Sequence, residues 1–156
     1  MTEIAERGVY SWQEIVTQAD SWRGALDAVE AQERAVQKLL GADGRVLFIG
    51  CGSTHYLAQF AAPFFQATTG RLSQGLPSSE LLLQSETIIA PGEQPTVVAL
   101  SRSGDTSETI LAVQKARALG CKTLTISCYD DTGLSHTSDL TIGIPQGREK
   151  SFAQTR

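Results

Sequence analysis

The sequence contains few of the residues that metal sites and disulfide networks require. Its 156 residues include three cysteines and two histidines. The cysteines form no CxxC pair, and the histidines lack the ligand spacing to them that zinc sites show. We therefore expect no metal ion. Cys121 and Cys128 flank a predicted strand, and we interpret both as small buried apolar side chains.

Long apolar runs and basic clusters are also missing. No run reaches the roughly 18 apolar residues of a membrane-spanning helix. The first residues, MTEIAERG, include no apolar signal region. The chain carries 13 Lys and Arg against 17 Asp and Glu, which gives a net charge of −4. Nothing in this balance attracts nucleic acid or an acidic membrane. We expect a cytoplasmic protein without a membrane or nucleic-acid partner, although a helix terminus can still bind a small anion.

The first forty residues show two helical patterns. Residues 11–14 read SWQE, the form of a capping box, which predicts a helix start there. An amphipathic pattern then covers residues 22–40 and is followed by glycine. We therefore predict an N-terminal helical segment over residues 1–41 and one domain over residues 42–156, since the length suits a single core.

Short apolar runs alternate with helical patterns over the rest of the chain. Such runs predict strands buried on both faces, which is typical of a parallel sheet covered by helices. The sequence therefore predicts an α/β fold, a three-layer α-β-α sandwich with a parallel sheet of about five strands. The predicted strands cover residues 45–50, 72–75, 96–100, 122–127 and 139–144, and the predicted helices between them cover residues 55–68, 81–83, 106–119 and 134–137.

The predicted strand over residues 96–100 leads directly into hydroxyl side chains, in the stretch TVVALSRSGDTSET. Hydroxyls and the unpaired N–H groups of a helix start can surround a phosphate without a metal ion. Plain helix capping by Thr106 or Ser107 would produce part of the same pattern. These residues alone leave phosphate binding and capping open, and the two can coexist.

A glycine-containing loop, GCGST over residues 50–54, follows an earlier strand. It is no dinucleotide fingerprint, because His55 stands where GxGxxG has its third glycine and no acid closes a second strand about twenty residues on. It is no Walker loop either, since GK[ST] is absent. Both loops follow the carboxyl ends of predicted parallel strands, so we expect them to meet over one site for a small polar ligand.

Four separated segments resemble the sugar isomerase (SIS) domain family. They are FIGCGSTHYLAQ, ALSRSGDTSETILAVQKARALG, TLTISCYDDTGLSHTSD and GREKSFAQTR, in the order that the family shows. The pattern is similar to the isomerase half of glucosamine-6-phosphate synthase. The leader SWQEI and the arginine in SRSGD resemble the tagatose-6-phosphate ketose/aldose isomerase group. The resemblance covers about the whole chain.

The resemblance implies a phosphosugar site. Ser101, Ser103 and Thr106 match the hydroxyls that bind the phosphate. Arg102 lies between them, where it either adds a charge-assisted bond to the phosphate or projects into solvent. The residues expected to contact the sugar are Gly52, Ser53 and Thr54.

Glu149, in GREKSFAQTR, matches by this resemblance the glutamate that acts as general base in the synthase. A carboxylate suits aldose–ketose isomerisation, in which a proton moves between C1 and C2 through an enediol. No cofactor is implied. Without the resemblance, Glu149 would be interpreted as a surface acid paired with Arg148 or Lys150. We interpret His55 as an ordinary first-turn residue of a helix rather than a base.

The resemblance also implies more chain and a partner domain. Family members carry two SIS domains in one chain or pair single domains in a dimer, whereas this chain ends at Arg156, inside its last motif. We therefore expect the N-terminal part of a longer protein, truncated at the C-terminal end of its SIS domain. We also expect it to form a homo-oligomer or to pair with a second SIS domain, and the competence of these residues alone is left open.

Two functions fit these residues. The first is aldose–ketose isomerisation, with or without deamination, of an amino sugar phosphate or a related hexose phosphate such as tagatose 6-phosphate. The alternative is a non-catalytic SIS module that senses a sugar phosphate in a regulator. Such regulators carry a basic helix-turn-helix segment, but acids outnumber basic residues in the first forty residues here. This balance favours the enzyme.

Overall fold

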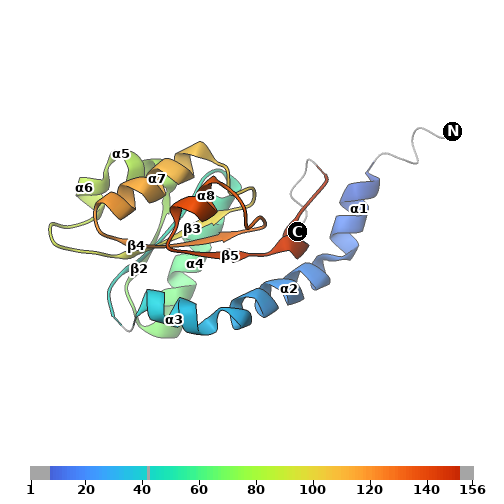
Figure 1. Ribbon diagram of the computed structural model, residues 1–156, viewed down its shortest axis with the longest axis horizontal. Helices are drawn as coiled ribbons and strands as arrows, with labels where there is room; N and C mark the ends of the chain where they lie inside the picture. The colour runs from blue at the N-terminus through green and yellow to red at the C-terminus, as the bar shows by residue number, and fades with distance from the viewer. Residues whose placement is uncertain (1–7, 42, 152–156) are drawn as a thin grey trace.

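The computed structural model describes residues 8–41 and 43–151, and its strands form one parallel sheet. The order across the sheet is β2-β1-β3-β4-β5, with β3 in the centre, and every neighbouring pair is parallel (Figure 1). The predicted five-stranded parallel sheet is confirmed. The strands are β1 (Val46–Gly50), β2 (Ser73–Pro77), β3 (Thr96–Ser101), β4 (Lys122–Ser127) and β5 (Leu140–Gly143).

Apolar side chains on both faces of the central strands hold the sheet between two helical layers. In β1, Leu47 and Ile49 belong to one buried cluster and Val46 and Phe48 to another, because side chains alternate between the faces of a strand. The unbroken apolar runs therefore reflect burial on both sides. One layer contains α5 (Ser78–Leu83), α6 (Ser85–Ile88), α7 (Ser107–Ala118) and α8 (Gly133–Thr137), and the other contains α3 (Glu33–Leu40) and α4 (Ser53–Thr69).

The N-terminal residues form three helices where the sequence predicts two. They are α1 (Val9–Val16), α2 (Gln18–Ala31) and α3, and Figure 1 shows α1 and α2 leading away from the sheet. The predicted capping box is wrong. Ser11 lies inside α1, which begins after Gly8, and the carboxylate of Glu14 binds a distant segment instead of the helix start. A tertiary contact has replaced the local one.

The helix α2 is attached to the body through the short 3₁₀ turn η1 (Pro145–Gly147). Ser21 donates a hydrogen bond from Oγ to the carbonyl oxygen of Gln146, at 2.7 Å. One turn on, a Cβ at Gly24 would lie 2.6 Å from the Gln146 side chain, so α2 and η1 pack closely at this point. No helix within residues 8–41 and 43–151 is both long and apolar enough to cross a membrane.

The edge strand and the chain after it differ most from their predicted boundaries. The strand predicted over residues 72–75 is β2, which begins one residue later and ends two residues later, and the single predicted turn of helix is the pair α5 and α6. β2 contains glycine and polar residues, since only Leu76 in it is fully buried. Pairing with β1 and contact with α4 decide where β2 lies. The side chains of β2 show no apolar pattern from which these boundaries could be predicted.

The contact between β2 and α4 predicts an effect on stability. A Cβ at Gly75 would lie 2.4 Å from the carbonyl oxygen of Ala58. The nearest atoms belong to the backbone of Ala58 and Gln59, which cannot move aside as a flexible side chain can. We expect Gly75→Ala to reduce the free energy of unfolding by about 1–3 kcal/mol, as other overpacked contacts do. Urea unfolding followed by circular dichroism measures it. Gln74→Ala, at the exposed neighbouring position, is the control, and equal stabilities for the two variants would contradict this packing.

Candidate functional site

The carboxyl ends of three neighbouring strands bring the candidate residues together. β1 runs into the loop 51–52, β3 into 102–106 and β4 into 128–132. The strand order reverses its direction between β1 and β3, and in parallel sheets ligands bind beyond the carboxyl ends at such a point. The expectation that the two hydroxyl-containing loops meet over one site therefore agrees with the topology.

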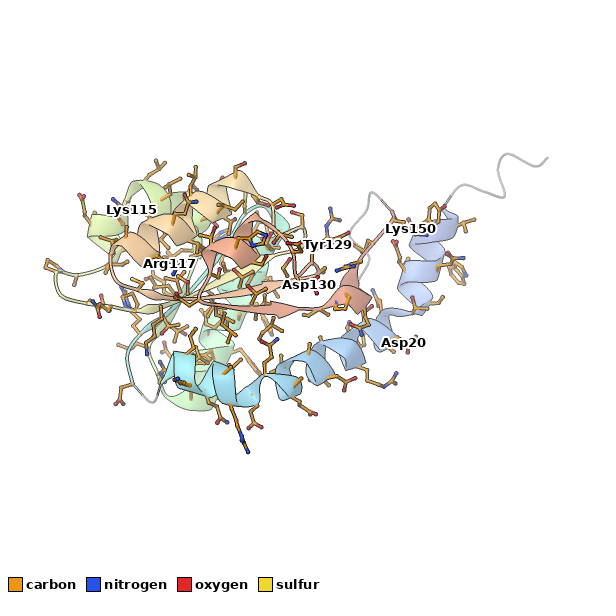
Figure 2. The ribbon with its side chains drawn as sticks, viewed as in Figure 1. Asp20, Lys115, Arg117, Tyr129, Asp130 and Lys150 are labelled. Carbon is orange, nitrogen blue, oxygen red and sulfur yellow. The ribbon has the colours of Figure 1, made fainter. Side chains whose placement is uncertain are left out.

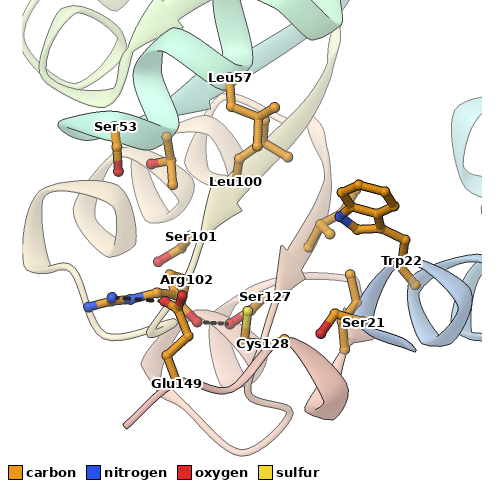
Figure 3. Close-up of a pocket in the computed structure, with 15 residues that line it drawn as sticks. Ser21, Trp22, Ser53, Leu57, Leu100, Ser101, Arg102, Ser127, Cys128 and Glu149 are labelled. Carbon is orange, nitrogen blue, oxygen red and sulfur yellow. Dashed lines mark hydrogen bonds and ion pairs between the residues drawn. The ribbon is translucent and has the colours of Figure 1, made fainter. Parts of the chain in front are cut away.

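A cavity of about 590 Å³ opens at this point. Figure 3 shows it bounded by α4 on one side, by α2 on another and by the strand ends below. Trp22, Leu57 and Leu100 give it apolar walls, whereas Ser101, Ser127 and other hydroxyls give it polar ones. It also contains the charged groups of Arg102 and Glu149.

The loop after β1 is folded tightly by its own hydrogen bonds. Thr54 Oγ1 accepts from the Cys51 N–H and donates to the Cys51 carbonyl, both at 3.0 Å. A Cβ at Gly50 would lie 2.4 Å from the carbonyl of Thr54, and Gly52 has a φ of 60°, which favours glycine. This turn delivers Ser53 and Thr54 to the cavity wall at the start of α4.

The loop after β3 is also shaped by its hydroxyls. Ser101 Oγ accepts from the Gly104 N–H at 3.0 Å, and Ser103 Oγ accepts from the Asp105 N–H at 3.3 Å. Thr106 is the N-cap residue of α7, as expected, but its side chain makes no capping hydrogen bond. The capping interpretation of this side chain is therefore not supported, and the start of α7 is left with its positive dipole end beside the loop.

The two acids closest to the start of α7 are turned to other partners. Asp105 accepts from the Gly133 N–H at 2.9 Å, at the start of α8. Glu108 accepts from the Ser79 N–H at 2.9 Å and from the Cys51 thiol at 3.5 Å. Both carboxylates thus have hydrogen-bond partners in the protein, and Asp105 also lines the smaller cavity that Ser103 lines.

Arg102 and Glu149 form an ion pair inside the cavity. The Arg102 Nη1 to Glu149 Oε2 distance is 3.2 Å, and the two side chains are 39% and 3% exposed (Figure 3). The backbone of Arg102 is held as well, since its carbonyl accepts from Ser127 Oγ and from the Cys128 N–H. Glu149 is therefore a buried acid at the site. It is not the surface acid that the residues alone suggested, and Arg102 does not simply project into solvent.

The structure places the predicted residues at different distances from the cavity. Ser53, Thr54, Ser101, Arg102 and Glu149 line it. Ser103 lines a smaller neighbouring cavity that Arg102 and Glu149 share. Gly52 and Thr106 shape the two loops and line neither cavity. Phe152 and the residues after it, which complete the last motif, lie outside the described residues.

Sequence reasoning missed part of the cavity wall. Ser127 and Cys128 end the strand beside β3, and strand order could have indicated them. Trp22 and Ser21 come from α2, for which no pattern in the sequence indicates a place at the site. His55 contributes no cavity wall, which agrees with its interpretation as a first-turn helical residue.

The pKa values of two thiols near the site are raised. Burial raises the pKa of Cys128, and the charge of Glu149 raises it further, against smaller opposite effects of Arg102 and Arg148. Burial also raises the pKa of Cys51, with a further contribution from Glu108. Neither thiol has the depressed pKa of a nucleophilic cysteine. Within residues 8–41 and 43–151, no group of three or more His, Cys, Asp or Glu side chains could hold a metal ion.

Comparisons with known proteins agree on one family. A model described as SIS domain matches residues 38–156. The chain is 31% identical over 123 residues to an isomerizing glutamine–fructose-6-phosphate aminotransferase of Tropheryma whipplei strain Twist, covering 76% of this chain and 18% of that protein. It is 24% identical over 133 residues to the D-galactosamine-6-phosphate deaminase AgaS of Escherichia coli O157:H7, covering 81% and 35%.

A solved structure shows the same fold. The tagatose-6-phosphate ketose/aldose isomerase from Escherichia coli superposes with a TM-score of 0.84 at 23% identity, covering 95% of this chain and 44% of that one. The chain thus spans less than half the length of each of these three proteins.

The raised thiol pKa values predict low reactivity at neutral pH. A raised pKa leaves less thiolate at any given pH, so alkylation of Cys51 or Cys128 by iodoacetamide should reach its half-maximal rate at a higher pH than for a free cysteine. Mass spectrometry of variants that each retain one of the two thiols measures the profile. The same variants in denaturing urea are the control, and a thiol that reacts faster in the folded protein would contradict the prediction.

Proposed function

The chain belongs to the SIS domain family, and from that premise we propose that its cavity binds a sugar phosphate. The relatives are sugar-phosphate isomerases or deaminases, named for hexose or hexosamine 6-phosphates. We further propose that the whole protein isomerises an amino sugar phosphate or a related hexose phosphate, such as tagatose 6-phosphate, with or without deamination.

The observation that carries the proposal is the loop between β3 and α7. Ser101, Arg102 and Ser103 of this loop line the two neighbouring cavities, and the side chain of Thr106, at the start of α7, makes no capping hydrogen bond. Hydroxyl donors, a helix N-terminus and one guanidinium suit a phosphate group. The cavity of about 590 Å³ lies within the usual range for small-molecule sites.

The rest of the cavity suits a sugar. Its apolar walls, from Trp22 and Leu57 among others, can pack against the carbon-bound hydrogens of a hexose, while the hydroxyl of Ser53 can bond a sugar hydroxyl. With the phosphate at the start of α7, the carbohydrate would lie across the strand ends toward Glu149. This orientation places the reacting carbons near a carboxylate.

We assign proton transfer to Glu149. Its carboxylate, 3% exposed, lines the cavity and is shielded from water. In the proposed step the carboxylate removes the proton from C2 of the open-chain aldose, and the electrons form an enediolate with its charge on the C1 oxygen. The proton of the C2 hydroxyl then passes to the C1 oxygen, and the carboxyl group of Glu149, whose proton exchanges with solvent, returns a proton to C1. No cofactor enters this step. The Arg102 guanidinium holds the carboxylate in place and is itself within reach of an anionic substrate.

The ion pair also favours a second candidate function. Because Glu149 is already bound to Arg102 at 3.2 Å, the pair could serve to shape the cavity without transferring a proton. The site would then be a non-catalytic module that senses a sugar phosphate. The two functions share the same ligand and differ in the role of one carboxylate.

A partner domain remains part of the proposal. Large apolar side chains of α4 and α2 are exposed, including Leu57, Phe60 and Trp22, and of these Leu57 and Trp22 line the cavity. We propose that a second SIS domain, in a homo-oligomer or in the same longer protein, covers them and completes the cavity. Light scattering of the purified chain measures its molar mass and so shows whether it forms a homo-oligomer. The predicted cytoplasmic location stays a prediction.

Sugar-phosphate affinity should depend on Ser103. In Ser103→Ala one hydroxyl donor to a charged group is lost, for which we expect a loss of roughly 1.5–3 kcal/mol, or about ten- to a hundredfold in Kd. Calorimetric titration with glucosamine 6-phosphate, galactosamine 6-phosphate and tagatose 6-phosphate measures the effect. Thr68→Ala, at the far end of α4, is the control. Unchanged affinity in Ser103→Ala would place the phosphate elsewhere.

Isomerisation should exchange a carbon-bound hydrogen of the substrate with the solvent. Enediol formation in D₂O exchanges deuterium into C2 of the aldose phosphate, and NMR detects it without net turnover. We expect exchange with the whole protein and its loss in Glu149→Gln, with Glu86→Gln on the exposed surface of α6 as the control, whereas the 156-residue chain alone should bind without exchange. Binding without exchange by the whole protein favours the sensing module. Absence of both binding and exchange for all three sugar phosphates would overturn the proposed function.

A further inference from the structure

Glu14 is the one buried residue of α1 (Val9–Val16). It is 4% exposed, whereas Trp12 on the same helix is 67% exposed and Val16 is 56% exposed. Acidic side chains are almost never buried unless hydrogen bonds satisfy them, because removing a charge from water is costly. The burial of Glu14 therefore indicates a specific set of bonds and not the packing of an apolar helix face.

The Glu14 carboxylate binds the backbone that directly follows Glu149. Glu14 Oε1 accepts from the Lys150 N–H at 2.5 Å and from the Ser151 N–H at 3.1 Å. Glu14 Oε2 accepts from the Ser151 hydroxyl. Successive N–H groups converging on one anion form a concave binding site for it, and bonds to a charged acceptor are stronger than neutral ones.

The residue on the other side of Glu149 is anchored to the body of the protein. Arg148 donates from Nε to the Cys128 carbonyl at 3.1 Å and pairs with Asp130 at 2.9 Å. Its guanidinium also lies over the ring of Tyr129, 4.8 Å from the centroid. Figure 2 shows Tyr129 and Asp130 beyond β4, and Lys150 beside α1. Glu149 thus lies between one anchor on the sheet and one on the N-terminal helix.

The N-terminal helices therefore contribute to the site twice. α2 supplies Trp22 and Ser21 to the cavity wall, and Ser21 also binds the carbonyl of Gln146. α1 continues from α2 through Thr17 and supplies the acid that binds residues 150 and 151. The segment that bears Glu149 is bonded at both ends to these helices.

We propose that Glu14 is a positioning residue of the site. By binding the amides of Lys150 and Ser151, it fixes the backbone that carries Glu149 and so sets the reach of that carboxylate toward Arg102 and the ligand. The role of Glu149 in proton transfer rests on the proposed function, whereas the restraint on residues 149–151 does not. An error of about 1 Å in the place of a reacting group can cost about a hundredfold in rate.

Three variants separate positioning from simple attachment of α1. Glu14→Ala removes the acceptor, Glu14→Gln keeps one amide oxygen and loses the charge, and Asp20→Asn removes an exposed acid of α2 as the control. NMR measures amide hydrogen exchange at Lys150 and Ser151 and the Hε signal of Arg102. In Glu14→Ala we expect faster amide hydrogen exchange at Lys150 and Ser151 and a changed chemical shift of the Arg102 Hε. Both effects should be smaller in Glu14→Gln and absent in Asp20→Asn.

The same variants are tested on the ligand. With the sugar phosphate that wild type binds, we expect deuterium exchange at saturation to fall by about a hundredfold in Glu14→Ala with unchanged Kd, and Glu14→Gln to recover part of the rate. If Glu14 only attaches α1, then Glu14→Ala should speed amide hydrogen exchange within α1 but leave the Arg102 chemical shift and the rate per folded molecule unchanged. That result would overturn the proposal.

The two proposals fail in different ways. If wild type catalyses no exchange, the proposed catalysis fails, and the amide and Arg102 signals still decide whether Glu14 positions the segment. If wild type catalyses exchange and Glu14→Ala does so equally well, with protected amides at residues 150 and 151, the positioning role is wrong and the proposed function stands. Should Glu14→Ala unfold by circular dichroism, Glu14→Gln provides the same comparison.

Discussion

The parallel pairing of all five strands is the constraint on which the rest of the structure depends. It places the carboxyl ends of β1, β3 and β4 at one edge, and the reversal of strand order between β1 and β3 separates the connections that leave them. Two loops rich in glycine and hydroxyls then face a common cavity. Residues about fifty positions apart in the chain become neighbours because backbone pairing brings their strands together, before any side chain of the site makes a contact.

Charged groups that leave water complete the cavity, and each requires a partner. Glu149 meets Arg102, and Glu14 meets the amides of residues 150 and 151. A buried charge without its partner is costly, so these bonds specify where each segment lies more than they add to stability. In this way electrostatics link the N-terminal helix, the central strand and the last segment, which share little apolar surface.

One cavity suits both proposed functions because binding and catalysis would use different parts of it. The start of α7 and its hydroxyls suit the phosphate, and a sensor needs nothing more than this recognition. An isomerase needs in addition a carboxylate whose position is fixed relative to C1 and C2. The bonds of Arg148 to Cys128 and of Lys150 to Glu14, on the two sides of Glu149, restrain that position.

Local patterns in the sequence predicted the central strands and the two loops, whereas tertiary contacts decide the edge strand β2 and how the cavity is closed. Unbroken apolar runs predicted the central strands, and the hydroxyls of residues 101–106 predicted a polar loop, because both signals are local. The expected capping box at Ser11 was wrong, since Glu14 satisfies distant amides. Cys128 lines the cavity besides flanking its strand, and Trp22 forms its wall. Contacts between segments more than a hundred residues apart leave no periodic pattern in the chain, so only the folded protein shows them.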